Sequence, residues 1–149
     1  MLPPDIHPCL QGIMPSTMVS CSLDGVPNTT YLSQVYYVDE THVALSFQFF
    51  NKTIRNVREN PYVSVLVTDP RGFSQWRLNI RYDHSETDGD LYEQMEMQLE
   101  AVSSMHGLDG IFNLQAAIYT RSCRRTNWIF MSKTPRPPKP LRSAQTKTP

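Results

Sequence analysis

The sequence lacks several features that would assign it to a common class of protein at once. It has no run of about eighteen apolar residues that could span a bilayer. Its 14 basic residues balance its 14 acidic ones, so no broad basic field exists to attract a phosphate backbone. We therefore expect neither a membrane nor a nucleic acid as the partner.

Cysteine is also scarce. Cys9, Cys21 and Cys123 are odd in number and widely spaced, unlike the dense, even set of a small secreted scaffold. His7 lies near two of them, but there is no C-x-x-C pair and no second histidine at ligand spacing. We expect no metal site, and the simplest interpretation is a protein of the reducing cytoplasm.

The sequence also lacks a recognisable set of catalytic residues for nucleophilic catalysis, such as a Ser/His/Asp triad. His42, His84 and His106 are scattered among expected turns and strand edges. They form no Ser/His/Asp order, and none stands near a cysteine that could act as a nucleophile. The sequence therefore indicates no catalytic side chain.

What the chain does contain is a succession of short β-rich segments separated by turn residues. At 149 residues and 40% apolar composition, it fits one globular domain with one core. Strands are expected at 18–23, 29–37, 42–50, 62–68, 74–82 and 111–118. The first three are predicted to form an antiparallel meander that begins with a hairpin at Asp24-Gly25. On the fifth strand, Trp76, Leu78 and Ile80 should face the core.

Two helices are expected between these strands. Thr53 can cap a short helix that ends at Glu59, because the residue before Pro61 avoids the helical region. A longer helix should run from a cap at Asp88 to Gly107. Its apolar positions are Leu91, Met95, Leu99 and Val102, and we expect the methionines Met95, Met97 and Met105 to serve packing. Six strands and two short to medium helices indicate a mainly β protein built as a small antiparallel barrel.

The end of the chain has a different composition. After about Trp128 it is rich in proline, lysine, serine and threonine, which leaves too little apolar surface to offset chain ordering. We therefore place one domain at residues 1–127 and a disordered tail at 128–149.

Asn51, Lys52 and Thr53 stand together where an aromatic strand gives way to the short helix. A helix N-terminus offers unpaired backbone amides and the positive end of the helix dipole, which favour phosphate. Lys52 adds a charge, Thr53 a hydroxyl and Asn51 an amide, and Arg55 or Asn56 could reach the same point. The alternative is that these side chains only cap and solvate the helix.

A fixed order of motifs surrounds this stretch. It comprises a Gly25-Val26-Pro27 turn, a strand through Tyr31-Leu32-Ser33, a turn with Asp39, an aromatic strand end, Lys52-Thr53, Asn56 and Asn60-Pro61. Together these motifs resemble the FMN-binding split-barrel family of pyridoxamine 5'-phosphate oxidase. The resemblance covers roughly residues 12 to 119 and is most specific between 16 and 61. It implies a six-stranded antiparallel split β-barrel that binds FMN.

The resemblance also implies which residues hold the cofactor. In the family, the strand after the Gly-x-Pro turn lays its backbone along the pyrimidine edge of the flavin. The corresponding residues here are Thr30, Tyr31, Leu32 and Ser33. The next strand and the start of the helix hold the ribityl phosphate. Their counterparts are Ser46, Phe47, Gln48, Asn51, Lys52 and Thr53.

In function, the resemblance implies a flavin-dependent oxidoreductase that moves hydride or electrons between FMN and a small-molecule substrate or nicotinamide donor. It further implies a homodimer with the flavin between the subunits. Tyr37, Phe47, Phe49 and Trp76 are candidates for that interface and equally for the core. Two alternatives remain: a non-catalytic sensor or carrier of flavin, deazaflavin or haem, and a structural homodimer without a cofactor.

The chain departs from the family in two places. The family's enzymes commonly have Ser-Arg-Lys where this chain has Asn51-Lys52-Thr53, so a hydroxyl replaces one positive charge. The C-terminal segment that closes their substrate pocket, with a Trp and paired Arg residues, has no counterpart around Trp128. The resemblance therefore does not extend to vitamin B6 oxidation itself.

Overall fold

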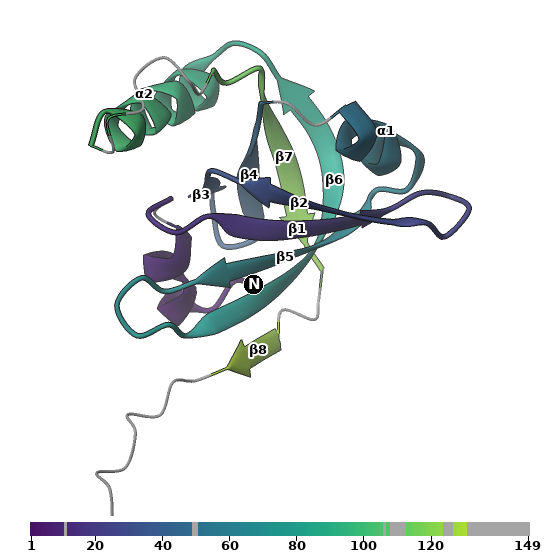
Figure 1. Cartoon of the computed structure of the whole chain (residues 1–149), viewed down its shortest axis with the longest axis horizontal. Coiled ribbons are helices and arrows are strands. Elements are labelled where there is room, and N and C mark those ends of the chain that lie inside the picture. Colours follow the sequence, from purple (N-terminus) through teal and green to yellow (C-terminus); the bar gives the residue numbers. More distant parts are fainter. Residues whose placement is uncertain (11, 49–50, 106, 108–112, 124–126, 131–149) are drawn as a thin grey trace, which may run out of the picture.

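The computed structural model describes residues 1–10, 12–48, 51–105, 107, 113–123 and 127–130. Within these residues the chain is mainly β, with eight strands, two α-helices and one 3-10 helix (Figure 1). The elements are η1 (Pro4–Leu10), β1 (Ser16–Cys21), β2 (Pro27–Leu32), β3 (Val35–Tyr37), β4 (His42–Phe47), α1 (Asn51–Glu59), β5 (Tyr62–Thr68), β6 (Gln75–Glu86), α2 (Asp90–Met105), β7 (Ala116–Ser122) and β8 (Asn127–Phe130). No helix of the described residues is long and apolar enough to cross a membrane.

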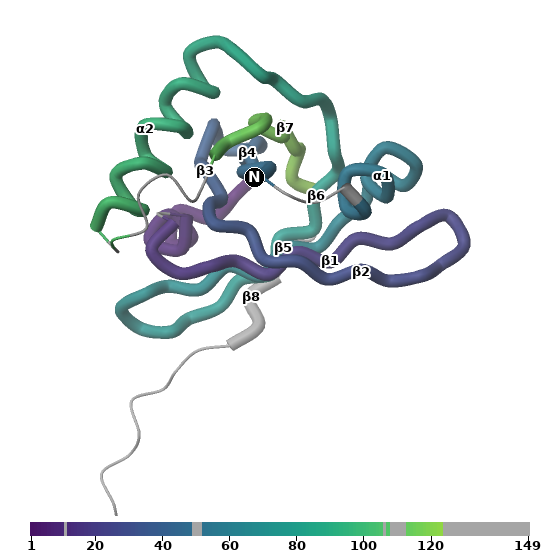
Figure 2. The backbone as a smooth tube through the Cα atoms, turned by 45° about the horizontal axis from the view of Figure 1, so that its top comes forward, coloured from purple at the N-terminus to yellow at the C-terminus, as the bar shows by residue number. Residues whose placement is uncertain are grey.

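The strands form one antiparallel sheet in the order β2-β1-β5-β6-β7-β4-β3, and β8 pairs with β6 outside this path. The sheet curves around a common interior, as the tube in Figure 2 shows. Although β2 and β3 lie at opposite ends of the strand order, only residues 33–34 separate them in the chain. This short link brings the two ends of the sheet together and gives it the form of a half-open barrel.

Both antiparallel pairings expected in the meander of the first three strands are present, but the middle strand is not continuous as predicted. The hairpin of β1 and β2 is confirmed, with Thr17 opposite Tyr31 and Val19 opposite Thr29. The segment 29–37, however, is interrupted at Ser33–Gln34, and its second part, β3, pairs with β4. The interruption and the additional strand β8 explain why the structure has eight strands where the sequence predicts six.

Several element boundaries also differ from expectation. α1 ends at Glu59 as predicted but begins at Asn51, so Thr53 lies inside the first turn and does not cap the helix. β6 continues to Glu86, with a bulge between Tyr82 and His84. β7 runs from Ala116 to Ser122, and the expected strand residues 111–112 lie outside the described residues. η1 was not foreseen, because its sequence contains two prolines, Pro4 and Pro8.

The strand β8 runs three residues past the expected domain boundary at residue 127. It pairs antiparallel with the first part of β6. The rest of the expected tail, residues 131–149, lies outside the described residues.

The barrel interior is filled by alternate residues of the strands. Val63, Val65 and Val67 of β5 are buried, and Leu78 and Ile80 of β6 are buried beside them, as predicted. η1 adds the fully buried Ile6 to this cluster. Because inward and outward side chains alternate along a strand, such a pattern closes an apolar core with a polar outer face.

A second, smaller cluster fixes α2 against the sheet. Met95 and Leu99 of α2 pack on Ala44 of β4 and Ala117 of β7. The two alanines leave room for the helix to approach the strands. The packing role predicted for the methionines is confirmed for Met95 and is wrong for Met97 and Met105, which are exposed.

The aromatic residues considered for an interface lie mostly at the edge of the core. Tyr37, Phe47 and Trp76 are partly buried and pack against the main hydrophobic cluster. Phe49 lies outside the described residues. The structure therefore favours the core alternative for these three side chains.

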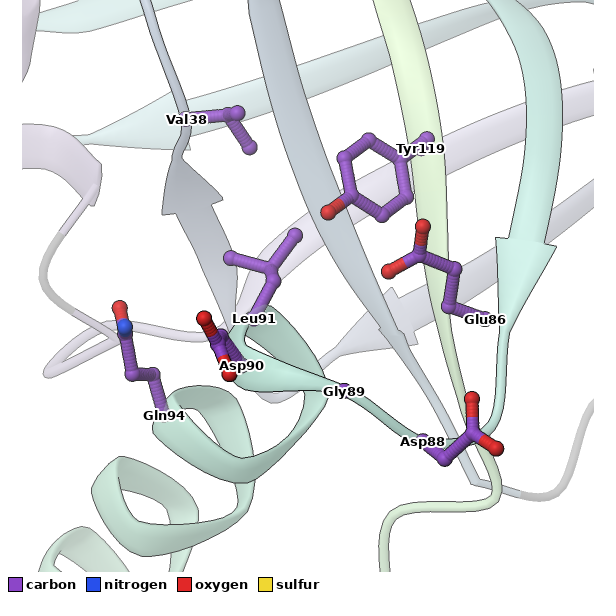
Figure 3. Close-up of a pocket in the computed structure, with 8 residues that line it drawn as sticks. All are labelled: Val38, Glu86, Asp88, Gly89, Asp90, Leu91, Gln94 and Tyr119. Carbon is purple, nitrogen blue, oxygen red and sulfur yellow. The ribbon is translucent and has the colours of Figure 1, made fainter.

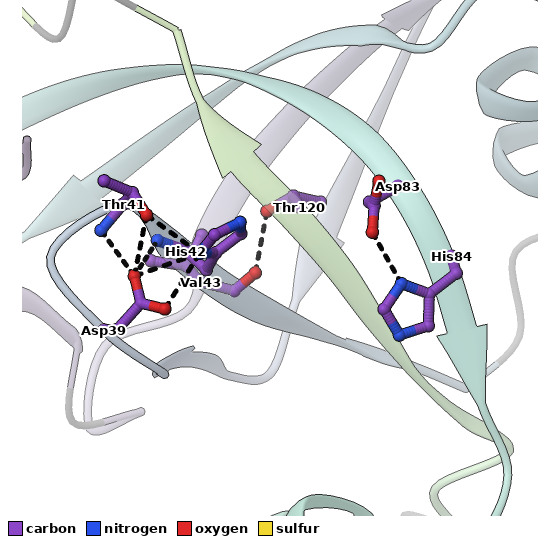
Figure 4. Close-up of polar contacts among 7 residues, drawn as sticks. All are labelled: Asp39, Thr41, His42, Val43, Asp83, His84 and Thr120. Carbon is purple, nitrogen blue, oxygen red and sulfur yellow. Dashed lines mark hydrogen bonds and ion pairs between the residues drawn. The ribbon is translucent and has the colours of Figure 1, made fainter.

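The turn between β3 and β4 is held by one carboxylate. Asp39 Oδ1 accepts hydrogen bonds from the backbone amides of Thr41 at 2.6 Å and His42 at 2.9 Å, and from the Thr41 hydroxyl (Figure 4). The hydrogen bond from the Thr41 amide is the main cause that lowers the pKa of Asp39 to about 2. Beyond the turn, Thr120 Oγ1 of β7 donates to the carbonyl of Val43 at 2.8 Å.

The packing of β4 makes a direct prediction about stability. Leu45 is fully buried, so Leu45→Ala should lower the free energy of unfolding by about 2–5 kcal/mol. Leu23 is exposed in the β1–β2 turn, and Leu23→Ala should change it by no more than about 0.5 kcal/mol. Urea denaturation midpoints with unchanged slopes measure both values. Equal losses in the two variants would contradict this packing.

Candidate cofactor site

The expected cofactor residues lie on β2, at the end of β4 and at the start of α1. Two side-chain hydrogen bonds join these elements although they are far apart in the sequence. Asn28 Nδ2 of β2 donates to Thr53 Oγ1 of α1 at 2.9 Å. Just after β2, Ser33 Oγ lies 2.9 Å from Ser46 Oγ of β4. The three segments that the resemblance singled out therefore meet around β2.

α1 is fixed in place by two side-chain hydrogen bonds and an apolar contact. Thr53 is only 4% exposed and is held by Asn28. One turn later, Asn56 Nδ2 donates to Ser20 Oγ of β1 at 3.2 Å, and Val57 is buried in the main cluster. Thr53 and Asn56 thus anchor the helix to the β1–β2 hairpin, which the sequence alone did not indicate.

The N-terminal end of α1 concentrates positive charge. Lys52 and Arg55 are exposed, and neither forms an ion pair within the part of the chain that the structure describes. The first turn of α1 contains no acidic residue, although acidic side chains are favoured at that end of a helix. α1 begins at Asn51, so Lys52 and Arg55 lie near the positive end of its dipole, and no acidic side chain of the first turn offsets their charge.

The outer edge of β2 offers backbone groups. β2 pairs with β1 on one side, and no strand of the described residues pairs with its other side. Thr30 is half-buried, Tyr31 is 70% exposed and Leu32 is buried in the core. An unpaired strand edge presents amide donors and carbonyl acceptors to a ligand, whereas the side chain of Leu32 takes part in packing.

A compact polar cluster closes the other end of the site. Gln48 Nε2 donates to Ser33 Oγ at 2.9 Å, and Ser46 Oγ accepts from the backbone amide of Gln34 at 3.1 Å. The neighbouring Phe47 packs toward the core, and its carbonyl accepts from the Gln115 amide. Of the residues predicted on the second strand, the structure thus brings Ser46 and Gln48 together with Ser33.

Gln34 was not predicted to matter, yet its side chain is unusual. The residue is buried, and among the described residues neither its amide nitrogen nor its amide oxygen has a hydrogen-bond partner. A buried amide without partners costs free energy, so it calls for a physical reason. No sequence signal could have identified it, because the burial depends on the turn of the chain at residues 33–34.

The donors at this junction fit a phosphorylated ligand with a polar, uncharged part. The exposed Lys52 and Arg55 and the first-turn amides of α1 suit phosphate. The bond that Thr53 Oγ1 accepts from Asn28 does not use the hydroxyl proton of Thr53. The free edge of β2 and the amide of Gln48 suit a neutral polar group.

An open pocket of about 540 Å³ lies elsewhere, at the start of α2 (Figure 3). It is lined by Val38, Glu86, Asp88, Gly89, Asp90, Leu91, Gln94 and Tyr119. The acidic stretch at 84–90 was visible in the sequence, but the contribution of Tyr119 from β7 was not. Among the described residues, no group of three or more His, Cys, Asp or Glu side chains could hold a metal ion.

His84 contacts Tyr119, one of the residues that line this pocket. Its ring stacks on Tyr119 with centroids 4.4 Å apart. Its Nδ1 lies 2.7 Å from Asp83 Oδ2, as Figure 4 shows. The hydrogen bond to Asp83 is the main cause that raises the pKa of His84. Burial, followed by the hydrogen bond to Glu86, raises the pKa of Tyr119. Both rings are therefore held by neighbouring carboxylates.

Solved structures with similar folds include three with informative names. An FMN-binding protein from Syntrophomonas wolfei subsp. wolfei has 13% sequence identity and a TM-score of 0.64, with 88% of each chain covered. An F420 reductase has 15% identity and a TM-score of 0.58 over 82% of this chain and 96% of its own. HutZ, the haem storage protein from Vibrio cholerae, has 17% identity and a TM-score of 0.56 over 87% and 94%.

At these identities the likeness establishes the fold, a mainly β split barrel. No curated protein sequence matches the chain. A family model described as pyridoxamine 5'-phosphate oxidase, however, matches residues 2–117, which is well over half of the chain. The chain therefore belongs to the pyridoxamine 5'-phosphate oxidase family.

Proposed function

We propose that the protein binds FMN and acts as a flavin-dependent oxidoreductase, which moves hydride or electrons between the cofactor and a small-molecule substrate or nicotinamide donor. The observation that carries the proposal is the uncompensated charge of Lys52 and Arg55 at the N-terminus of α1, beside the free edge of β2. A bound flavin supplies the redox chemistry, so no catalytic base is required of the chain.

The residues of the chain have separate tasks in this proposal. Lys52, Arg55 and the first-turn amides bind the phosphate, while Thr53 holds the helix at the correct place through Asn28. The backbone from Thr30 to Ser33 runs along the pyrimidine edge of the ring. Binding and orientation are thus divided between the helix end and the strand edge.

We propose a homodimer that forms through the outer face of the sheet. Val19, Tyr31 and Tyr62 are 40%, 70% and 62% exposed. Tyr31 is opposite Thr17, and Val19 is opposite Ser64. Thr17 and Val19 are two residues apart on β1, as Tyr62 and Ser64 are on β5, so the three side chains point to one face of the sheet. Aromatic and apolar side chains gathered on one sheet face are typical of an interface core.

A second candidate function is a non-catalytic carrier or sensor of flavin, deazaflavin or haem. The fold likeness to a haem storage protein and to an F420 reductase supports this second candidate. His84 has both ring nitrogens within hydrogen-bond distance of carboxylates, Asp83 and Glu86. Such a ring would have to release one carboxylate before it could ligate iron. Free thiols at all three cysteines accord with the cytoplasmic location that we propose.

An absorbance spectrum separates the two functions. We expect the purified protein, after incubation with FMN and desalting, to retain the two visible absorption bands of oxidised flavin. A Soret band would instead establish the haem carrier, and a featureless spectrum would contradict any cofactor proposal. With the flavin bound, oxidation of NADH or NADPH under steady-state conditions tests whether the protein is an enzyme.

The phosphate site makes a sharper prediction. Lys52→Ala should raise the dissociation constant for FMN roughly tenfold, because it removes a charge-assisted contact to the phosphate. The same variant should bind riboflavin, which has no phosphate, with unchanged affinity. Flavin fluorescence quenching measures both constants.

Arg58 is the matched control for this experiment. It is also an exposed cation on α1 but belongs to the last turn of the helix. Arg58→Ala should leave the affinity for FMN unchanged. Equal effects of the two substitutions would show that only the general charge of the protein matters and that α1 holds no phosphate site.

The dimer proposal is tested on the sheet face. Val19→Glu places a charge among Tyr31 and Tyr62 and should convert the dimer into a monomer, as measured by sedimentation equilibrium at micromolar concentration. Met97→Glu changes another exposed apolar residue, on α2, and should leave the dimer intact. A monomeric wild-type protein, or a dimer that survives Val19→Glu, would refute this interface.

A further inference from the structure

Half of the acidic residues gather on one surface, formed by the end of β6 and by α2. Seven of the 14 acidic residues lie between residues 83 and 100, a stretch that contains no lysine or arginine. They are exposed, except for the half-buried Glu86, and form the acidic face: Asp83, Glu86, Asp88, Asp90, Glu93, Glu96 and Glu100. Among the described residues none of them pairs with a lysine or arginine, and the ion pairs of Asp83 and Glu86 are with His84.

The open pocket at the start of α2 lies within the acidic face (Figure 3). Glu86 from β6, Asp88 from the connection and Asp90 from α2 line it. Tyr119 adds an aromatic ring and Leu91 an aliphatic side chain, and no lysine or arginine is among its described lining residues. The pocket therefore suits a ligand that combines positive charge with apolar surface.

The opposite charge lies after β8, in residues 131–149, which we name the basic segment. These 19 residues contain none of the 14 acidic residues of the chain and five of its 14 basic ones. The five are Lys133, Arg136, Lys139, Arg142 and Lys147. Residues 1–130 consequently hold nine basic and 14 acidic residues, so the even balance of the whole chain conceals two parts of opposite charge.

The basic segment also has the apolar part that the pocket suits. Residues 135–140 read PRPPKP, in which Arg136 and Lys139 alternate with prolines. Such a sequence favours the polyproline II conformation, which binds aromatic surfaces at a low cost in conformational entropy. The proline rings could pack on Tyr119 while the neighbouring cations reach the carboxylates of the acidic face.

The basic segment is long enough to reach this pocket. Phe130 of β8 is opposite Gln75 at the start of β6, and Glu86 ends the same strand. Along β6 this separation is at most about 36 Å, because a strand rises about 3.3 Å per residue. A polyproline II chain rises about 3.1 Å per residue, so roughly twelve residues cover the distance. Arg142 is that far from Phe130, and Lys147 lies beyond it.

We propose that the basic segment binds to the acidic face of its own chain and covers the pocket at the start of α2. A single exposed ion pair contributes little, so binding requires several pairs together. The covalent link through β8 keeps the segment at a high effective concentration beside the face. This contact does not depend on a bound flavin.

Carbodiimide crosslinking of the full chain tests the contact, because the reagent joins a lysine amine directly to a carboxylate. The only lysine outside the basic segment is Lys52, which makes the crosslinks simple to assign. Mass spectrometry of the monomer band from a denaturing gel should find Lys139 and Lys147 joined to Asp88 and Asp90. In 1 M NaCl, where the Debye length is about 3 Å, these crosslinks should fall roughly threefold or more.

Two double variants provide matched controls. Asp88→Asn with Asp90→Asn removes two charges beside the pocket, and asparagine still caps a helix. Crosslinks to the unchanged Glu93 should then fall roughly threefold, because fewer anions attract the segment. Asp24→Asn with Glu59→Gln removes two exposed charges, in the β1–β2 turn and at the end of α1, and should leave the crosslinks to Glu93 unchanged. If the first variant does not fold, the salt dependence of the wild-type protein decides the question.

Three results would overturn the proposal. One is crosslinking of the basic segment to Asp24 and Glu59 as often as to the acidic face. Another is crosslinks that occur only between two copies of the chain, in the dimer band. The third is the absence of crosslinks from the basic segment, or crosslinks that salt leaves unchanged.

Discussion

The structure depends on the way in which the ends of its sheet are joined at Ser33–Gln34. A single curved sheet leaves two edges, and here the first and last strands in the order are successive in the chain. Gln34 lies between β2 and β3 and belongs to neither strand. Its backbone amide donates to Ser46 Oγ, and its carbonyl accepts from the Ser46 amide. These bonds hold the end of β2 against the end of β4. The same junction therefore closes the barrel and brings the elements of the candidate site together.

The same junction includes a feature that costs folding free energy. Within the part of the chain that the structure describes, the buried amide of Gln34 has no partner for either polar atom, and an unsatisfied buried group costs about 1–3 kcal/mol. Immediately beside it, the Ser33, Ser46 and Gln48 side chains form a continuous hydrogen-bonded chain. Both glutamines are almost completely buried, and the structure describes a side-chain hydrogen bond for Gln48, to Ser33, but none for Gln34.

α1 shows how anchoring and binding can be divided within one helix. Thr53 and Asn56 face the hairpin and use their side chains to hold the helix, while Lys52 and Arg55 remain exposed. Because no acidic residue stands in the first turn, the field of the helix dipole and the two cations add instead of cancelling. The anchoring residues keep this positive end beside the free edge of β2, which makes one site from two elements.

Much of this protein follows from its sequence. Alternating apolar residues determine the strands, as on β5, and a single short turn at Asp24-Gly25 determines the hairpin, because both signals are local. The charge around Lys52 and the end of α1 before Pro61 could also be read directly. What only the tertiary structure decided is how these parts meet. The break at Ser33–Gln34 and the burial of Thr53 depend on contacts with Ser46 and Asn28, and no local pattern encodes a contact between distant residues.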